Sequence, residues 1–450
     1  MLSLQELRES LEVAEHLARL SLSSGGDRCD SEAPKTPRPK PYVPPKQLLL
    51  YLVRMGSFTS KPQVQQVECA EDKVGVPEGV AAGRALLQWV REPIAHLPPL
   101  LPRFYRTPPP PPVRRPSQSL VQPPISPSGV VGAGPSARPC PVLMPAPTPP
   151  PAAPTSFRVM QWNILAQALG THADNFAQCP REALKWDTRK YRILEEVLTH
   201  LPHVLCLQEV DHFTYLETVL SRQGYQGVFM PKPDSPCLYL PNNNGPDGCA
   251  VFWDDGKFEL IKKESRVVEV WHVQSNQVAI LLVLEERVSG QRLVVLTTHL
   301  KARQGALLAS LRNEQGKDLI SFLDEHRGDA PTVVCGDFNA EPTEPVYTTM
   351  TDPSTQLKSA YSNLHGGSEP DYSTWKVRGD VDCCHNIDYI FYTPETLRVD
   401  GGVDVPTEED LGPGRAPCLA YPSDHFSLIC DLSFAEAHAP TTRPKEESSR

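Results

Sequence analysis

Short apolar runs alternate with helical patterns of apolar residues between Phe157 and about Phe434. The run Val204–Val210 is almost wholly apolar until its last residues, which is typical of a buried central strand whose end opens on a site. Trp186–Leu201 carries its large apolar side chains at helical spacing, on one face. The remaining pattern predicts a helix at Leu307–Phe322 and strands at Phe157–Leu165, Val278–Leu284, Leu293–Thr298, Thr332–Cys335, Ile387–Tyr392 and Phe426–Leu432.

The predicted strands outnumber the helices and come in runs, which favours two packed sheets over one doubly wound sheet. We therefore predict an α/β fold for residues 156–435: a four-layer sandwich of two packed mixed β-sheets flanked by helices. About 280 residues is the size of one large domain. Residues 436–450 are predicted to form a disordered tail.

Residues 1–95 have a mixed texture and are predicted to be weakly structured. Two short apolar stretches, Leu48–Val53 and Ala85–Val90, predict small helices. A further helix is predicted at the N-terminus, where an apolar stripe follows Leu4, Leu7, Leu11, Ala14 and Ala18. Acidic residues interrupt that stripe, and import signals avoid acids, so we expect a surface or partner-binding helix there.

Residues 96–155 are rich in proline, and the chain's 49 prolines are about twice the usual share. Such a segment cannot bury enough apolar surface to offset the entropy lost on ordering. We predict a disordered or polyproline-II linker, so that most of the N-terminal region is disordered. An inert spacer is favoured over a segment that binds protein partners.

The net charge of −10 and the pI near 5.8 give no general attraction to nucleic acid, so a polyanionic substrate needs a local basic patch. The 12 cysteines show no C-x-x-C spacing, which indicates neither a zinc site nor a disulfide framework and favours a reducing compartment. No stretch reaches the roughly 18 apolar residues that span a bilayer. We expect a monomeric catalytic domain in the cytoplasm, with the mitochondrion and nucleus as alternatives.

Polar clusters lie beside almost every predicted strand of the domain. One acid at a strand end is usually a turn former or a solvated side chain, but six clusters are hard to explain in that way. Because a packed sandwich brings one set of strand ends together, we expect the clusters to converge on one cleft. They are Gln161–Asn163, Gln208–Glu209, Thr298–His299, Gly336–Asn339, Asp388 and Ser423–His425.

The acids and amides of these clusters suit a metal ion. Carboxylates such as Glu209 and Asp424 are hard ligands of the kind that Mg²⁺ prefers. The side-chain amide of Asn163 can hold a water bound to the metal. The sequence therefore predicts a Mg²⁺ site from Glu209, Asn163 and Asp424.

The remaining polar residues suit hydrolysis of a phosphate ester. Asp337 can orient and deprotonate an attacking water. Asn339, His299 and His425 can donate hydrogen bonds to phosphate oxygens as charge builds, while Asp388 fixes the tautomer of His425. Other hydrolase signatures are missing from the sequence, which has no G-x-S-x-G, P-loop or H-E-x-x-H motif.

Six motifs in order, Q-W-N-I-L, C-L-Q-E-V, T-H-L, G-D-F-N, I-D-Y-I and S-D-H, resemble the endonuclease/exonuclease/phosphatase superfamily. The resemblance is closest to its deadenylase-like branch and runs almost continuously from about Phe157 to Phe434. The first 155 residues do not visibly share it. The carrying segments are Arg158–Gly170, Asn175–Pro180, Glu182–Trp186, Asn243–Ala250, Thr298–Arg303 and Cys335–Glu344.

The resemblance implies a Mg²⁺-dependent phosphatase that removes the 2′-phosphate of NADP⁺ and NADPH, in a group linked to circadian rhythm and metabolism. It makes the counterpart of Glu209 the principal metal ligand. The counterparts of Lys232, Lys301 and Arg303 hold the phosphates, and Lys376 lies in the matching T-W-K segment. Lys and Arg suit this role because they give charge-assisted hydrogen bonds to phosphate.

One segment departs from the family pattern. After Arg303 the family usually continues with Gly-Trp-Glu, whereas here Gly305 is followed by Ala306 and Leu307. We therefore expect local substrate contacts or helix packing to differ at this point.

Two other functions stay open. The sister deadenylases are Mg²⁺-dependent 3′ exonucleases on poly(A) RNA, which needs an open groove with stacking aromatics, whereas a dinucleotide needs one compact basic pocket. The acidic balance and the short Lys301-x-Arg303 cluster favour the compact pocket. The third function is a non-catalytic binding protein on the same scaffold, against which the intact set of acids and histidines argues.

Overall fold

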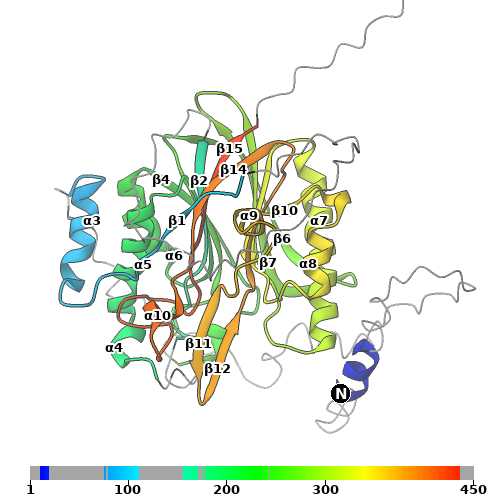
Figure 1. Ribbon diagram of the computed structural model, residues 1–450, viewed down its shortest axis with the longest axis horizontal. Coiled ribbons are helices and arrows are strands. Elements are labelled where there is room, and N and C mark those ends of the chain that lie inside the picture. Colours follow the sequence, from blue (N-terminus) through cyan, green and yellow to red (C-terminus); the bar gives the residue numbers. More distant parts are fainter. Residues whose placement is uncertain are drawn as a thin grey trace, which may run out of the picture.

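The computed structural model describes residues 11–19, 76–77, 80–110, 156–170, 176, 178–241 and 243–435. Figure 1 shows two β-sheets face to face at the centre of the molecule, with helices along both outer sides. The predicted helix at Leu48–Val53, residues 111–155 of the proline-rich segment and the predicted tail at residues 436–450 lie outside the described residues.

The first sheet has seven strands in the order β1-β14-β15-β2-β3-β5-β4. Strands β2 and β3 are parallel and the other neighbours are antiparallel, so the sheet is mixed. The strands are β1 (Tyr105–Arg106), β2 (Ser156–Asn163), β3 (Val204–Val210), β4 (Tyr225–Pro231), β5 (Gly248–Asp254), β14 (Leu397–Val403) and β15 (Leu428–Phe434).

The second sheet has six strands in the order β10-β13-β9-β8-β7-β6, with β8 and β9 parallel. A separate two-stranded hairpin, β11 (Thr374–Arg378) and β12 (Val381–His385), projects at the bottom of Figure 1. The six strands are β6 (Phe258–Val270), β7 (Val273–Glu286), β8 (Arg292–His299), β9 (Thr332–Asp337), β10 (Lys358–Ser359) and β13 (Asp388–Tyr392).

The core between the sheets is built from alternate residues of the facing strands. Val159 and Cys206 come from the first sheet, and Val295 and Cys335 from the second, and all four are fully buried. Cys206 and Cys335 pack there as small apolar side chains. Burial of these side chains between two sheets is the main force that stacks the sheets face to face.

Helices cover the outer face of each sheet, which makes four layers and confirms the predicted fold class (Figure 1). Helices α5 (Trp186–His200) and α6 (Phe213–Leu220) lie on the first sheet, with α3 (Arg84–Arg91) outside α5, and α7 (Ala306–Arg327) and α8 (Pro345–Met350) lie on the second. Shorter elements are α4 (Arg181–Leu184), α9 (Ala360–Leu364), α10 (Glu408–Leu411), η2 (Glu92–Ile94), η4 (Ser221–Gln223), η5 (Pro236–Tyr239) and η6 (Pro353–Thr355).

Residues 80–110 pack on the domain formed by residues 156–435. Helix α3 lies against α5, and β1 pairs with β14. The buried guanidinium of Arg103 donates to Glu196 Oε1 at 2.9 Å and to the Ser427 carbonyl at 2.7 Å. The prediction of a disordered linker from residue 96 is therefore wrong for residues 96–110, because strand pairing and these hydrogen bonds hold them.

Residues 11–19 form a helix beside the first turn of α7. Ala14 and Ala18 are buried against Leu307 and Leu308, so the helix predicted from the N-terminal apolar stripe is confirmed for its described part. Glu15 accepts hydrogen bonds from the backbone N–H groups of Ala306 at 2.6 Å and Leu307 at 2.9 Å. None of the helices in the described ranges is long and apolar enough to cross a membrane.

The strand directions bring the polar clusters to one end of the sandwich. Asn163, His299 and Asp337 are the last residues of β2, β8 and β9, and Asp388 is the first residue of the antiparallel β13. Asp388 lies directly opposite Asp337 in the ladder, and His299 lies opposite Asp337 on its other side. Residues distant in sequence therefore share one cleft, as the pattern predicted.

Candidate active site

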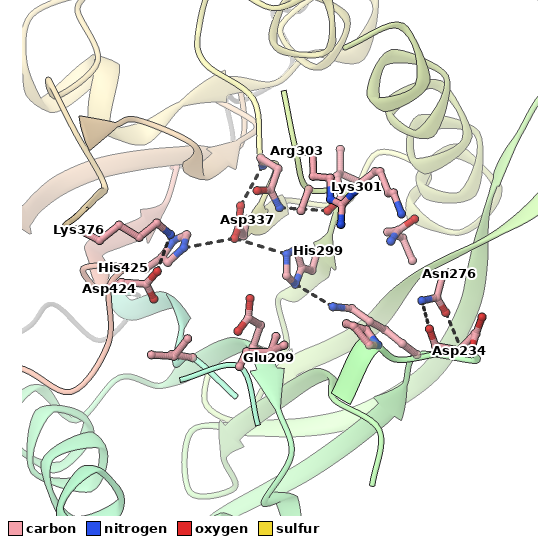
Figure 2. Close-up of a pocket in the computed structure, with 18 of the residues that line it drawn as sticks. Glu209, Asp234, Asn276, His299, Lys301, Arg303, Asp337, Lys376, Asp424 and His425 are labelled. Atoms are coloured by element: carbon pink, nitrogen blue, oxygen red, sulfur yellow. Dashed lines mark hydrogen bonds and ion pairs between the residues drawn. The ribbon is translucent and has the colours of Figure 1, made fainter. Parts of the chain in front are cut away.

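A cavity of about 420 Å³ opens at this end of the sandwich (Figure 2). Glu209, Asp337 and Asp424 contribute its acidic part. Lys301 and Arg303 lie across the cavity from Asp424, on the loop between β8 and α7. The site therefore brings carboxylates and cations together in one compact pocket.

Glu209 is turned into the pocket by an irregularity in β3. The register with β5 shifts between Leu207 and Val210, and Glu209 adopts a left-handed backbone conformation with φ of 54°. Its Oε1 accepts from Asn163 Nδ2 at 3.1 Å, and its Oε2 accepts from the Ala166 N–H at 3.1 Å. The carboxylate is thereby held from two sides.

Asn163 connects two acids of the site. Its Nδ2 also donates to Asp337 Oδ2 at 2.9 Å, while its Oδ1 accepts from the Leu165 N–H at 3.0 Å. The amide is thus fully engaged by protein groups. In this arrangement Asn163 fixes the position of Glu209 relative to Asp337.

Asp337 is buried at the end of β9. Burial and then the charge of Asp388 raise the pKa of Asp337 to about 7, against the opposing effects of His425, Asn163 and the Asn339 N–H. A carboxylate whose pKa lies near 7 can take up and release a proton at neutral pH. The role of Asp337 as the base that activates water stays a prediction.

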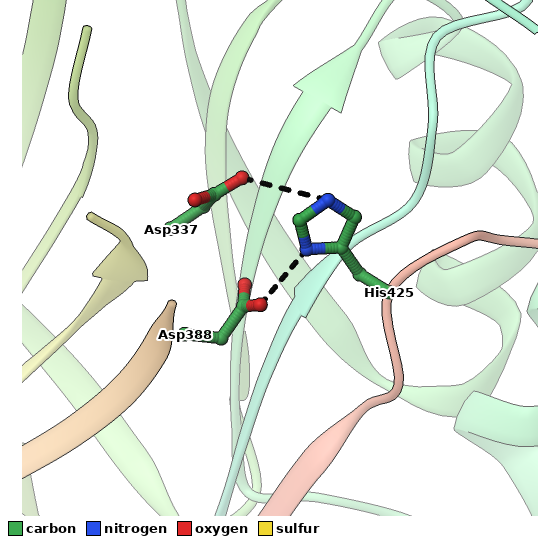
Figure 3. Close-up of side chains that lie close together, drawn as sticks. All are labelled: Asp337, Asp388 and His425. Carbon is green, nitrogen blue, oxygen red and sulfur yellow. Dashed lines mark hydrogen bonds and ion pairs between the residues drawn. The ribbon is translucent and has the colours of Figure 1, made fainter. Parts of the chain in front are cut away.

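Asp337, Asp388 and His425 form a buried cluster (Figure 3). His425 Nδ1 lies 2.8 Å from Asp388 Oδ2, and His425 Nε2 lies 3.8 Å from Asp337 Oδ2. Asp388 also accepts from Ser373 Oγ at 2.7 Å and from Gln161 Nε2 at 3.1 Å. Asp388 therefore fixes the ring from behind, as predicted, and directs Nε2 at the pocket.

The same acids set the charge of His425. Burial opposes the charged form, but Asp388, Asp337 and Asp424 outweigh it and raise the pKa of His425 to about 9. The ring is then a cation at neutral pH, with a proton on each nitrogen. It can donate through Nε2 to an oxygen that becomes negative in the pocket.

His299 is the opposite case. Burial, and then the positive charges of Lys232 and His425, hold the pKa of His299 well below its usual range. Lys232 Nζ lies 3.2 Å from His299 Nδ1 and 2.6 Å from Asp247 Oδ2. Because the ammonium is a donor, Nδ1 accepts, so the proton of the neutral ring is on Nε2, which lies 3.6 Å from Asp337 Oδ2.

Asp424 is paired on one side only. Its Oδ2 accepts from Lys376 Nζ of β11. Burial would raise the pKa of Asp424, but Lys376 and then His425 hold it well below its usual range. Its Oδ1 is buried and has no hydrogen-bond partner among the described residues. A buried anionic oxygen without a partner is what a cation site needs, and Glu209 lines the same cavity.

Lys301 and Arg303 form the cationic wall. Burial, and then the charges of Arg303 and Lys232, lower the pKa of Lys301 to about 8. Arg303 is exposed at the mouth, in a left-handed conformation with φ of 80°. Asn339 lines the pocket beside them, and its side chain donates to the Leu300 carbonyl at 3.1 Å.

Most of the predicted site residues line this one cavity, and Asn163 and Asp388 lie directly behind it. Sequence reasoning missed Arg378, although it lies two residues after Lys376 on a strand and therefore on the same face. It also missed Asp234, which is bonded to Asn276 and Tyr239 at the outer wall. No motif beside a predicted strand marked Arg378 or Asp234.

Comparison with known proteins agrees with this geometry. A model of the Endonuclease/Exonuclease/phosphatase family matches residues 160–425, which is more than half of the 450 residues. Nocturnin of Xenopus laevis is 51% identical over 288 residues, covering 63% of this chain and 74% of that protein. The chain belongs to the endonuclease/exonuclease/phosphatase family, among the nocturnins. The resemblance seen in the sequence, to nocturnin in the deadenylase-like branch, is thereby confirmed.

Other nocturnins extend the comparison. Nocturnin of Drosophila melanogaster is 45% identical over 434 residues, covering 91% of this chain and 64% of its own length. A solved structure of the human Nocturnin catalytic domain with a bound sulfate anion has 45% identity and a TM-score of 0.54, covering 62% of this chain and 95% of that one. The chain thus spans about two thirds of the length of the curated nocturnins.

A more distant relative is an RNA-degrading enzyme. The CCR4-Not complex 3′-5′-exoribonuclease subunit Ccr4 of Mycosarcoma maydis is 27% identical over 62% of this chain and 50% of its own length. Enzymes of this family cleave phosphate esters and generally depend on a divalent metal.

Proposed function

We propose that this protein is a Mg²⁺-dependent phosphatase that removes the 2′-phosphate of NADP⁺ and NADPH to give NAD⁺ and NADH. The observation that carries the proposal is the compact pocket in which carboxylates lie together with the cations Lys232, Lys301 and Arg303. A dinucleotide with a 2′-phosphate carries several negative charges close together, which these three cations can neutralise. The sulfate anion in the structure of human Nocturnin supports binding of a tetrahedral anion by this fold.

Each residue has a role in this proposal. Glu209 and Asp424 would hold the magnesium ion, since Asp424 Oδ1 has no other partner among the described residues. When bound, the ion offsets the charge that builds on the phosphate oxygens. Asp337 takes a proton from the attacking water, and His299 and His425 donate through Nε2 to the phosphate.

The second candidate is a 3′ exonuclease acting on poly(A) RNA. It rests on the relationship to Ccr4, an exoribonuclease, with the same kind of attack on phosphorus. Against it, Tyr239 is the single aromatic side chain other than histidine among the residues lining the described cavity. A tract of bound RNA needs repeated stacking and backbone contacts along an open groove.

One assay separates these functions. Purified protein with Mg²⁺ is given NADPH and, separately, a poly(A)-tailed RNA, and free phosphate and RNA length are followed. We expect release of phosphate from NADPH without shortening of the RNA. Shortening of the RNA with inert NADPH would identify the exonuclease instead. Binding of either molecule without turnover would identify a non-catalytic scaffold.

A further inference from the structure

Two arginines that do not line the pocket are fully buried behind it. Arg189 lies on α5, outside the first sheet, and Arg312 lies on α7, outside the second. Taking a guanidinium out of water is costly unless its donors are satisfied. The hydrogen-bond acceptors of each arginine therefore indicate what its charge is for, although Nη1 of Arg189 has no partner among the described residues.

Arg189 joins the two segments that carry the acidic part of the site. Its Nε donates to the carbonyl of Pro422 at 2.7 Å, and its Nη2 donates to the carbonyls of Ile164 and Leu165. Pro422 leads into the turn that carries Asp424, and Ile164 follows Asn163, which holds Glu209 and Asp337. A single planar group thus sets the spacing between the two segments.

A second contact reinforces the same joint. Ser423 Oγ donates to the Asn163 carbonyl at 2.7 Å and accepts from the His425 N–H at 3.1 Å. The same two segments are therefore linked by one charged group, the Arg189 guanidinium, and one neutral group, the Ser423 hydroxyl. The position of Asp424 and His425 relative to Asn163 depends on both.

Arg312 makes the corresponding joint on the cationic wall. Its Nη1 donates to the carbonyls of Lys301 at 3.0 Å and Arg303 at 2.6 Å. Its other side faces Glu344, with Nε and Nη2 at 2.9 and 2.8 Å from the carboxylate. Arg312 therefore holds the backbone of the loop that carries the cations Lys301 and Arg303. Glu344 in turn holds Arg312 at the start of α8.

We propose that Arg189 and Arg312 are positioning residues, each of which holds a different part of the site in place. Arg189 holds the acidic segments at the spacing that the chemical step needs, and Arg312 holds the Lys301–Arg303 backbone at the position that substrate binding needs. These separate roles rest on the proposed function in one respect, namely that Lys301 and Arg303 bind the phosphates of the substrate. Each arginine is the matched control for the other, because both are fully buried, both lie on helices and both donate to loop carbonyls.

The test is steady-state kinetics of Arg189→Lys and Arg312→Lys in the full chain, with Mg²⁺ and NADPH. Lysine keeps the charge but loses the planar fork. Arg189→Lys should lower kcat about a hundredfold and leave KM within about threefold of the wild type. Arg312→Lys should raise KM about tenfold and leave kcat within about threefold.

A second pair of variants tests the same joints without removing a buried cation. Ser423→Ala should give the kcat pattern of Arg189→Lys, and Glu344→Ala should give the KM pattern of Arg312→Lys. Hydrogen exchange without substrate should rise at residues 164–166 and 423–425 in the first group, and at residues 301–305 in the second.

Two results would overturn the division of roles. One is that the two groups show the same change in kcat and KM, and the other is that exchange rises evenly over the domain, as for a general loss of stability. If the wild type leaves NADPH unchanged and shortens poly(A) RNA, the proposed substrate is wrong. The same comparison then runs with the RNA, and hydrogen exchange still decides the positioning roles.

Discussion

At the scale of single residues, Glu209 is the group whose loss should be most costly to activity. Its carboxylate lines the pocket and is fastened by Asn163 and Ala166, so it is already in place before substrate arrives. We expect Glu209→Ala to lower kcat by at least about a hundredfold. Steady-state kinetics measures this loss of activity, and thermal melting measures the stability of the variant.

The melting temperature of that variant should stay close to the wild type, since Glu209 is only half-buried. Glu217→Ala, which removes an exposed glutamate of α6, is the control and should keep full activity. Near-normal turnover by Glu209→Ala would refute its assignment as a metal ligand.

Asp388 should control the titration of His425. The pKa of His425 is raised to about 9 with Asp388 as the largest favourable charge, so Asp388→Asn should move it down toward the ordinary value of about 6.5. NMR titration of histidine in metal-free protein measures this shift. Asp255→Asn, at an exposed ion pair, should leave the His425 titration unchanged.

The same shift makes stability depend on pH. Because the pKa of His425 is higher in the folded state, its stabilising effect is full below about pH 6.5 and is lost as the pH rises through about 9. The difference in unfolding free energy between metal-free wild type and Asp388→Asn should shrink across that window. An unchanged difference would show that Asp388 does not hold the charged ring.

Lys301 should give substrate affinity an alkaline limit. Its pKa of about 8 means that the free enzyme loses this cation as the pH rises through 8, so kcat/KM should fall there. Lys301→Arg keeps the charge and should move the fall to higher pH, and Lys301→Ala should raise KM in a salt-sensitive way. Lys263→Ala, at an exposed position on β6, should behave as the wild type.

The sequence identified the kinds of residue in the site better than their partners. Asp388 and His425 were predicted to act together because both belong to ordered motifs beside strands. The support given by Ser373 and Gln161 to Asp388 was not foreseen, since hydrogen bonds between distant segments leave no local pattern. Arg189 and Arg312 were missed for a related reason, because they act on backbone carbonyls, which every residue has.

At the scale of elements, long apolar strands were predicted well. Val204–Val210 was predicted with the bounds that the structure has, because a strand buried on both faces is apolar throughout. Strand β6 was missed, since the middle of its sequence F-E-L-I-K-K-E-S-R-V-V-E-V is a continuous polar run, K-K-E-S-R, on an outer, half-exposed strand. The β11–β12 hairpin was missed because it is short and polar, although it supplies Lys376 to the site.

Helix α7 depends on the N-terminal helix for its cap. Its own first turn has no acid and its N-cap, Gly305, has no side chain, so Glu15 takes over that role through the Ala306 and Leu307 N–H groups. We expect Glu15→Ala to lower the free energy of unfolding by about 1 kcal/mol, as loss of a cap does. Urea unfolding measures this loss.

Hydrogen exchange gives a local check on the same contact. The amides of Ala306 and Leu307 should exchange faster in Glu15→Ala than in Glu15→Gln, which keeps an acceptor oxygen. Equal exchange in the wild type and in both variants would show that the two helices are not joined by this residue. The Gly305-Ala306-Leu307 sequence departs from the family pattern at the position where this contact lies.

At the scale of the whole molecule, the four layers were predictable and the extent of the folded unit was not. The alternation of strands and helices after Phe157 identified the sandwich. Proline content suggested that folding begins only near residue 156, yet residues 80–110 pack on the sandwich through α3, Arg103 and β1. Composition reports how much apolar surface a segment can bury by itself, whereas these residues bury theirs against a surface that is already formed.

Strand β1 has a consequence for how the catalytic domain is isolated. It lies at the end of the seven-stranded sheet, with Tyr105 seated over Gly401 and donating to Asp431 Oδ2 at 2.8 Å. A fragment that began at Ser156 would leave the main-chain groups of β14 at Gly402 and Val403 open, which is a template for pairing with another chain. We expect that fragment to self-associate as its concentration rises in light scattering, while the full chain stays monomeric. Two residues of an otherwise proline-rich stretch would then be what keeps neighbouring copies of the enzyme apart.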